Sequence, residues 1–167
     1  VLRSSFSAPK LLHTLRSAPC AEPPALDRFD SLLRQAVSEI ANTDLSDMQW
    51  MQASLPVGLG GLGIRRVAQL APSAFLASAA STRRLQDSIL GSTSEQSDLQ
   101  IDRTLEVWSS RVPVSVPSDA AAVKQRSWDK PQVDRDFNLL LNSQQDSYSQ
   151  ARLRAVSAAH SSDWLNA

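Results

Sequence analysis

The chain has 167 residues, of which 42% are hydrophobic and 20% are charged, so it can bury a core and is not a disordered tail. Seventeen Lys and Arg residues balance seventeen Asp and Glu residues, which excludes a globally basic nucleic-acid-binding protein but allows a local basic face. One Cys and two His residues exclude a disulfide framework and a conventional zinc site, and we expect neither a metal nor a cofactor.

The longest weakly polar stretch, residues 67–80, is shorter than the roughly 20 apolar residues that a bilayer span needs. We therefore expect no membrane partner. A chain with a single Cys needs no oxidising compartment, so we expect an intracellular location, nuclear or cytoplasmic.

The first 54 residues carry three helix signals. Pro9 stands in the first turn of a short helix that ends before Pro19, and Pro23-Pro24 form a hinge. A longer amphipathic helix is expected at about 25–41, because apolar residues recur there at steps of three and four. These residues are Leu26, Phe29, Leu33, Val37 and Ile40. The last four are expected to face Trp50 and the pair Phe75–Leu76. Ser46 and Gln49 form a capping-box pattern at the start of a short helix.

The middle of the chain predicts two further helices. One turn of helix at 65–70 should lead to a separate alanine-rich helix that begins at Pro72, with Phe75, Leu76, Ala79 and Leu85 as its buried stripe. A polar loop follows at 91–98, and a helix at 99–110 should bury Leu105 and Trp108. No segment alternates with period two, so the sequence predicts an all-α fold built around a helical bundle.

Residues 112–117 read Val-Pro-Val-Ser-Val-Pro, an extended linker and the best candidate for a domain boundary. We divide the chain into a helical domain at 1–111 and a second helical segment at 118–167. That segment should hold helices at about 118–127, 131–142 and 148–160, with Val133, Phe137, Leu140 and Leu141 facing inward in the second. A further helix start at 161–165 is barely under way, and we interpret the chain as a fragment of a longer polypeptide.

The glycine-rich run 58–63 satisfies the pattern G-x-G-x-x-G, but a dinucleotide site also needs a preceding strand and an acid about 20 residues later. A helical segment precedes this run, and the next acid is Asp87. We therefore expect an ordered turn with positive φ and close backbone packing.

Catalytic patterns are missing from the sequence. Metal-dependent phosphoryl transfer needs converging carboxylates, and the chain has no Asp-Asp pair. His160 and Asp163 are hydrolase residue types without the setting that a nucleophile needs. We expect no enzyme activity from this chain alone.

Three neighbouring segments resemble one protein family. They are Trp50-Met51-Gln52-Ala53, then Leu55-Pro56-Val57-Gly58-Leu59-Gly60-Gly61-Leu62-Gly63-Ile64-Arg65, and then Ala74-Phe75-Leu76-Ala77-Ser78. This family comprises the reverse transcriptases of non-LTR (LINE-like) retrotransposons, in the region that follows the palm. The resemblance implies that 1–111 is a thumb-like helical domain that grips the template–primer duplex, and that 118–167 is a connector. It places the catalytic aspartate pair of the parent RNA-directed DNA polymerase upstream of Val1.

Residues 48–86 contain four arginines and no acid. Because this run coincides with the thumb-like resemblance, we expect these arginines to contact the phosphates of an RNA–DNA or DNA duplex, with two cations nearer the N-terminus as outlying members. The expected contact residues are Arg65, Arg66, Arg83, Arg84, Lys10 and Arg16. The alternative is that these arginines lie at solvated helix ends and do not contact phosphate. The chain would then be a retroelement-derived scaffold or protein-interaction module, whose partner is the rest of the parent polypeptide.

Overall fold

The computed structural model describes residues 2–20, 24–91 and 98–161, and all regular structure within them is helical, which confirms the all-α prediction. The elements are the π-helical turn η1 (Leu2–Phe6), α1 (Ala8–Ser17), α2 (Pro24–Ala41), α3 (Asp47–Ser54), the 3₁₀ turn η2 (Val57–Leu59), α4 (Val67–Leu90), α5 (Leu99–Arg111), α6 (Asp119–Ala122), α7 (Gln125–Ser143) and α8 (Ser147–Val156). Most of the predicted loop 91–98 and of the helix start at 161–165 lies outside the described residues.

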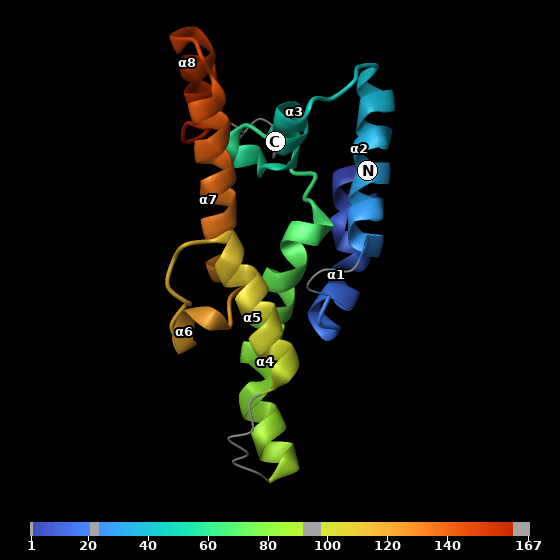
Figure 1. The fold of residues 1–167 in the computed structure, drawn as a ribbon, viewed down its shortest axis with the longest axis vertical. Helices are drawn as coiled ribbons and strands as arrows, with labels where there is room; N and C mark the ends of the chain where they lie inside the picture. Colours follow the sequence, from blue (N-terminus) through green and yellow to red (C-terminus); the bar gives the residue numbers. More distant parts are fainter. Residues whose placement is uncertain (1, 21–23, 92–97, 162–167) are drawn as a thin grey trace.

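Helix α4 is the central element of an elongated molecule (Figure 1). Helices α1 and α2 lie along one side of its N-terminal half, and α5, α6 and the first part of α7 lie along the other. The last turns of α4 extend beyond the other described helices at one end of the molecule, while α8 lies at the opposite end.

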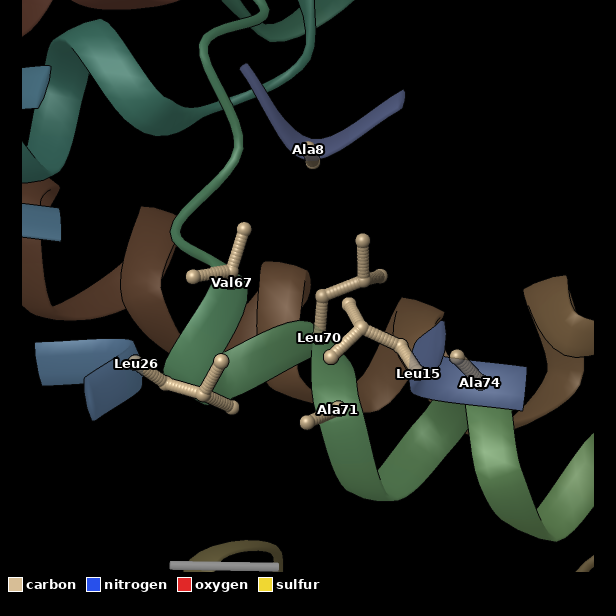
Figure 2. Packing of buried hydrophobic residues seen from close by; sticks show 7 residues of the cluster. All are labelled: Ala8, Leu15, Leu26, Val67, Leu70, Ala71 and Ala74. Atoms are coloured by element: carbon tan, nitrogen blue, oxygen red, sulfur yellow. The ribbon is translucent and has the colours of Figure 1, made fainter. Parts of the chain in front are cut away.

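The first hydrophobic cluster joins α1 and α2 to the N-terminal half of α4. Figure 2 shows its members, with Leu15 next to Leu70 and Ala74. Small residues at 71 and 74 let α1 approach the α4 backbone closely, and Leu15 is almost fully buried as a result. The members of this cluster are Ala8, Leu15, Leu26, Val67, Leu70, Ala71 and Ala74.

The second cluster packs α2 on α3. Leu33 and Val37 contact Trp50, as the helical period predicted. The prediction was wrong for Ile40, which is 75% exposed, because it lies in the last turn of α2, beyond the side chains of α3. Phe29 is half-buried, and Leu76 belongs to a different cluster.

The third cluster contains Trp108 and Trp128, whose rings meet edge to face with centroids 5.0 Å apart. The indole Nε1 of Trp108 donates to the Trp128 carbonyl at 2.9 Å, and Nε1 of Trp128 donates to the Ala122 carbonyl at 2.7 Å. Leu76 from α4 completes the contact. Side chains from both sides of the extended segment 112–117 therefore share one core. A fourth cluster packs α7 on α3 and α8. Its buried members are Leu55, Val133, Leu140 and Leu153, and Phe137 and Leu141 flank it.

Two prolines that were predicted to begin helices lie inside them. Helix α4 is continuous from Val67 through Pro72, and α7 is continuous from Gln125 through Pro131. Proline has no N–H, so Pro72 leaves the carbonyl of Ala68 without its helical donor. Nη1 of Arg111 donates to that carbonyl at 2.9 Å, which explains how the helix tolerates the proline.

Two other predicted boundaries and one predicted buried residue also differ. Helix α6 ends at Ala122 rather than near 127, and α8 ends at Val156 rather than at His160, which has a positive φ of 69°. Leu85 is 61% exposed and not part of a buried stripe, because it lies on the projecting end of α4.

The glycine run forms the tight turn that was predicted between α3 and α4. Gly60 and Gly63 have positive φ values of 77° and 70°, which glycine adopts without the steric cost that a side chain brings. A Cβ on Gly61 would lie 2.1 Å from the Leu55 carbonyl oxygen. The run therefore serves close backbone packing.

Candidate nucleic-acid interface

Arg65 and Arg66 lie just before α4, and both are directed toward α7. The Arg65 guanidinium donates two hydrogen bonds, at 2.7 and 2.6 Å, to the two carboxylate oxygens of Asp129. Nη2 of Arg66 donates to Asp136 at 2.7 Å. The side chains of Arg65 and Arg66 are only 23% and 19% exposed. Their charges are therefore neutralised within the chain, in a pair of ion bridges that we call the α4–α7 clamp.

The carboxylate of Asp136 is the more buried acceptor of the clamp, with its side chain 8% exposed. It also accepts hydrogen bonds from the amide of Gln69 on α4, at 3.1 Å, and from that of Gln132 on α7, at 3.0 Å. A buried carboxylate with three donors is well satisfied, so this junction is a structural one.

A third carboxylate, that of Asp30 on α2, caps the N-terminus of α4. Its two oxygens accept hydrogen bonds from the backbone N–H groups of Val67, at 2.8 Å, and Ala68, at 3.1 Å. Arg66, the residue at the N-cap position, provides no side-chain cap. Burial raises the pKa of Asp30 above its ordinary value, although the two backbone hydrogen bonds and Arg66 act in the opposite direction.

Arg83 and Arg84 occupy a different part of the molecule, on the projecting end of α4 (Figure 1). Both side chains are exposed, and neither forms an ion pair with another described residue. The same end of the helix exposes Leu85, Ile89 and Leu90, each more than 60% accessible.

Lys10 and Arg16 lie on α1. The Lys10 ammonium is 5.8 Å from the centre of the Phe6 ring, and Arg16 donates to the side-chain oxygen of Gln125 at 2.9 Å. Of the six predicted contact residues, the structure brings Arg65 and Arg66 together at the clamp. It leaves the pair on α1 and the pair at the end of α4 in separate places.

One concentration of cations could not be predicted from the sequence. Arg34, Arg66, Arg111 and Arg135 line a cleft of about 460 Å³ between α2, the start of α4, the end of α5 and α7. We call it the arginine cleft. Its arginines come from four elements that are far apart in the sequence, so no local charge pattern could have revealed it.

Other kinds of site find little support. Within the described residues, no three His, Cys, Asp or Glu side chains lie close enough together to hold a metal ion. His160 is exposed at the end of the described chain, and Asp163 lies outside it. None of the described helices combines the length and apolar character needed to cross a membrane.

Comparison of the chain with protein-family models, with curated proteins and with solved structures gave no match.

Proposed function

We propose that the chain is the thumb-and-connector region of a retroelement RNA-directed DNA polymerase, and that it contacts the backbone of a template–primer duplex without taking part in catalysis. One observation carries the proposal beyond the sequence resemblance. Arg83 and Arg84 are exposed and free of ion pairs with other described residues, on a helix end that projects from the molecule.

The clamp arginines have a supporting role in this proposal. Because Asp129 and Asp136 already occupy Arg65 and Arg66, a phosphate would have to displace a partly buried carboxylate to reach them. We therefore assign the duplex contact to Arg83 and Arg84, and we assign to Arg65 and Arg66 the task of holding α7 against α4. Lys10 and Arg16 remain outlying candidates on α1.

The test is a titration of an RNA–DNA hybrid at several salt concentrations. Each phosphate contact that is lost should lower the salt slope by about one unit, so Arg83→Ala/Arg84→Ala should lower it by about two. The loss should be similar for all duplex sequences, because phosphates carry no base information. The matched control is Arg152→Ala/Arg154→Ala, which removes two exposed arginines from α8 and should leave the slope unchanged.

A second candidate function is supported by the apolar side chains at the same helix end. Leu85 and Ile89 are one helical turn apart and strongly exposed, as they would be on a retroelement-derived scaffold that docks against the rest of its parent polypeptide. If the wild-type chain does not bind the hybrid, or if the Arg83/Arg84 variant binds with an unchanged slope, the duplex proposal is wrong and the scaffold is favoured.

A further inference from the structure

We propose that the arginine cleft is a binding site for a small ligand that carries a phosphate group. This site is separate from the proposed duplex contact, because it contains neither Arg83 nor Arg84. Its volume, about 460 Å³, lies within the range of about 300–1,000 Å³ that is usual for small-molecule sites.

The charges that line the cleft favour an anion. Four guanidinium groups and two carboxylates, those of Asp27 and Asp30, line the cleft, but Arg66 is already neutralised by Asp136. Both oxygens of Asp30 are already engaged by the backbone N–H groups at the start of α4. The positive charge that a ligand would meet therefore comes mainly from Arg34 and Arg135, and an anion would be attracted to it.

Two of the four arginines have guanidinium N–H groups that the described contacts within the chain do not use, and a ligand could accept hydrogen bonds from them. Nη1 of Arg135 donates to the backbone carbonyl of Arg111, a neutral acceptor, and Arg135 forms no ion pair with another described residue. Arg34 pairs with Asp47 at 2.7 Å, but the Asp47 side chain is 91% exposed, so solvent screens the pair strongly. A guanidinium has five N–H donors, and these contacts use one in Arg135 and two in Arg34.

The arrangement suits phosphate better than a carboxylate. A carboxylate presents two oxygens in one plane, which a single arginine fork satisfies. A phosphate monoester presents three terminal oxygens in different directions and carries up to two negative charges, so it can accept hydrogen bonds from arginines on different elements at once. Arg34 on α2 and Arg135 on α7 lie on two such elements of the cleft.

The experiment is calorimetric titration of the full chain with sodium phosphate, with sodium chloride at the same ionic strength as the reference. A second arm uses phenyl phosphate, which distinguishes a phosphorylated molecule from free phosphate as the preferred ligand. We expect saturable binding of at least one of the two compounds, with a dissociation constant of about 1 mM or lower. Absence of saturable binding in both arms would overturn the proposal.

Arg135→Gln should weaken this binding about tenfold, which is the effect of losing one hydrogen bond from a charged donor. The matched control is Arg126→Gln, an exposed arginine of the same helix that does not line the cleft, and its affinity should equal that of the wild type. Arg34→Gln provides a second test from α2, with Arg28→Gln as its control, and circular dichroism verifies that each variant is folded. If the cleft variants bind as tightly as their controls, the anion lies elsewhere and the proposal is wrong.

Discussion

Asp30 is the residue on which the start of α4 depends most directly. It is 8% exposed and 37 positions away from the first amide that it binds. Because Arg66 at the N-cap position supplies no side-chain acceptor, the carboxylate of a neighbouring helix satisfies two of the four backbone N–H groups that every helix start leaves open. One side chain thus caps α4 and fixes α2 against it.

Asp30→Ala should therefore lower the free energy of unfolding by about 1–3 kcal/mol, since it leaves two backbone donors without an acceptor. The control is Asp27→Ala, one turn earlier on α2 and exposed, which should change stability by less than about 0.5 kcal/mol. Urea unfolding followed by circular dichroism measures both values. Equal effects of the two variants would mean that water replaces the carboxylate at the start of α4.

At the scale of elements, the clamp determines how α7 lies on α4. Its two ion bridges connect residues that are 64 and 70 positions apart, and both are partly buried. Removing one member of such a pair costs more than breaking an exposed pair, because the remaining charge stays poorly solvated. Helix α7 takes part in both partly buried and exposed ion pairs, because Lys130 and Asp134 form an exposed pair one turn apart on this helix.

We predict that Asp136→Ala lowers the free energy of unfolding by about 2–4 kcal/mol, because Arg66, Gln69 and Gln132 all lose their shared acceptor. Asp134→Ala, on the same helix, should cost less than about 1 kcal/mol. Chemical denaturation of the two variants beside the wild type gives the comparison. A similar small loss in both would show that solvent reaches the clamp freely.

At the scale of the whole molecule, the extended segment 112–117 separates helices that still share a core. Trp108 lies before the segment and Trp128 after it, and each is at most 4% exposed. Their contact, together with the clamp, gives the two parts of the chain a common set of buried interactions. Parts that share buried interactions unfold together.

We therefore predict a single unfolding transition for the chain. The midpoints measured by tryptophan fluorescence and by far-ultraviolet circular dichroism should coincide in urea, because Trp50 reports on the α2–α3 cluster and the other two described tryptophans report on the cluster around α5. Two separate midpoints would mean that 1–111 and 118–167 behave as independent domains.

Local patterns were sufficient to predict much of this fold. The period of Leu33 and Val37 identified the buried face of α2, and the pair Ser46 and Gln49 forms both hydrogen bonds of the predicted capping box. In each case the interacting residues are neighbours in the sequence, so the pattern contains the information. The glycine turn belongs to the same group, because positive φ at Gly60 and Gly63 is a local requirement.

The parts that the sequence did not reveal depend on distant partners. Nothing near Arg65 or Arg66 indicates that acids of α7 neutralise them, and nothing near Val67 indicates a cap from α2. The arginine cleft is similar, because its four arginines come from four separate segments. Charge patterns along a chain locate cations, but only the packing of helices decides which cations are left unpaired.

The proline inside α4 has a consequence for how this sequence can change over generations. Pro72 and Arg111 are coupled through one carbonyl oxygen, that of Ala68. If Arg111 is replaced first, the oxygen is left without a donor inside a helix, which is costly. If Pro72 is first replaced by alanine, the new backbone N–H can serve the oxygen, and this carbonyl no longer requires Arg111 as its donor. For this hydrogen bond, the order in which the two positions change therefore decides whether the oxygen keeps a donor throughout.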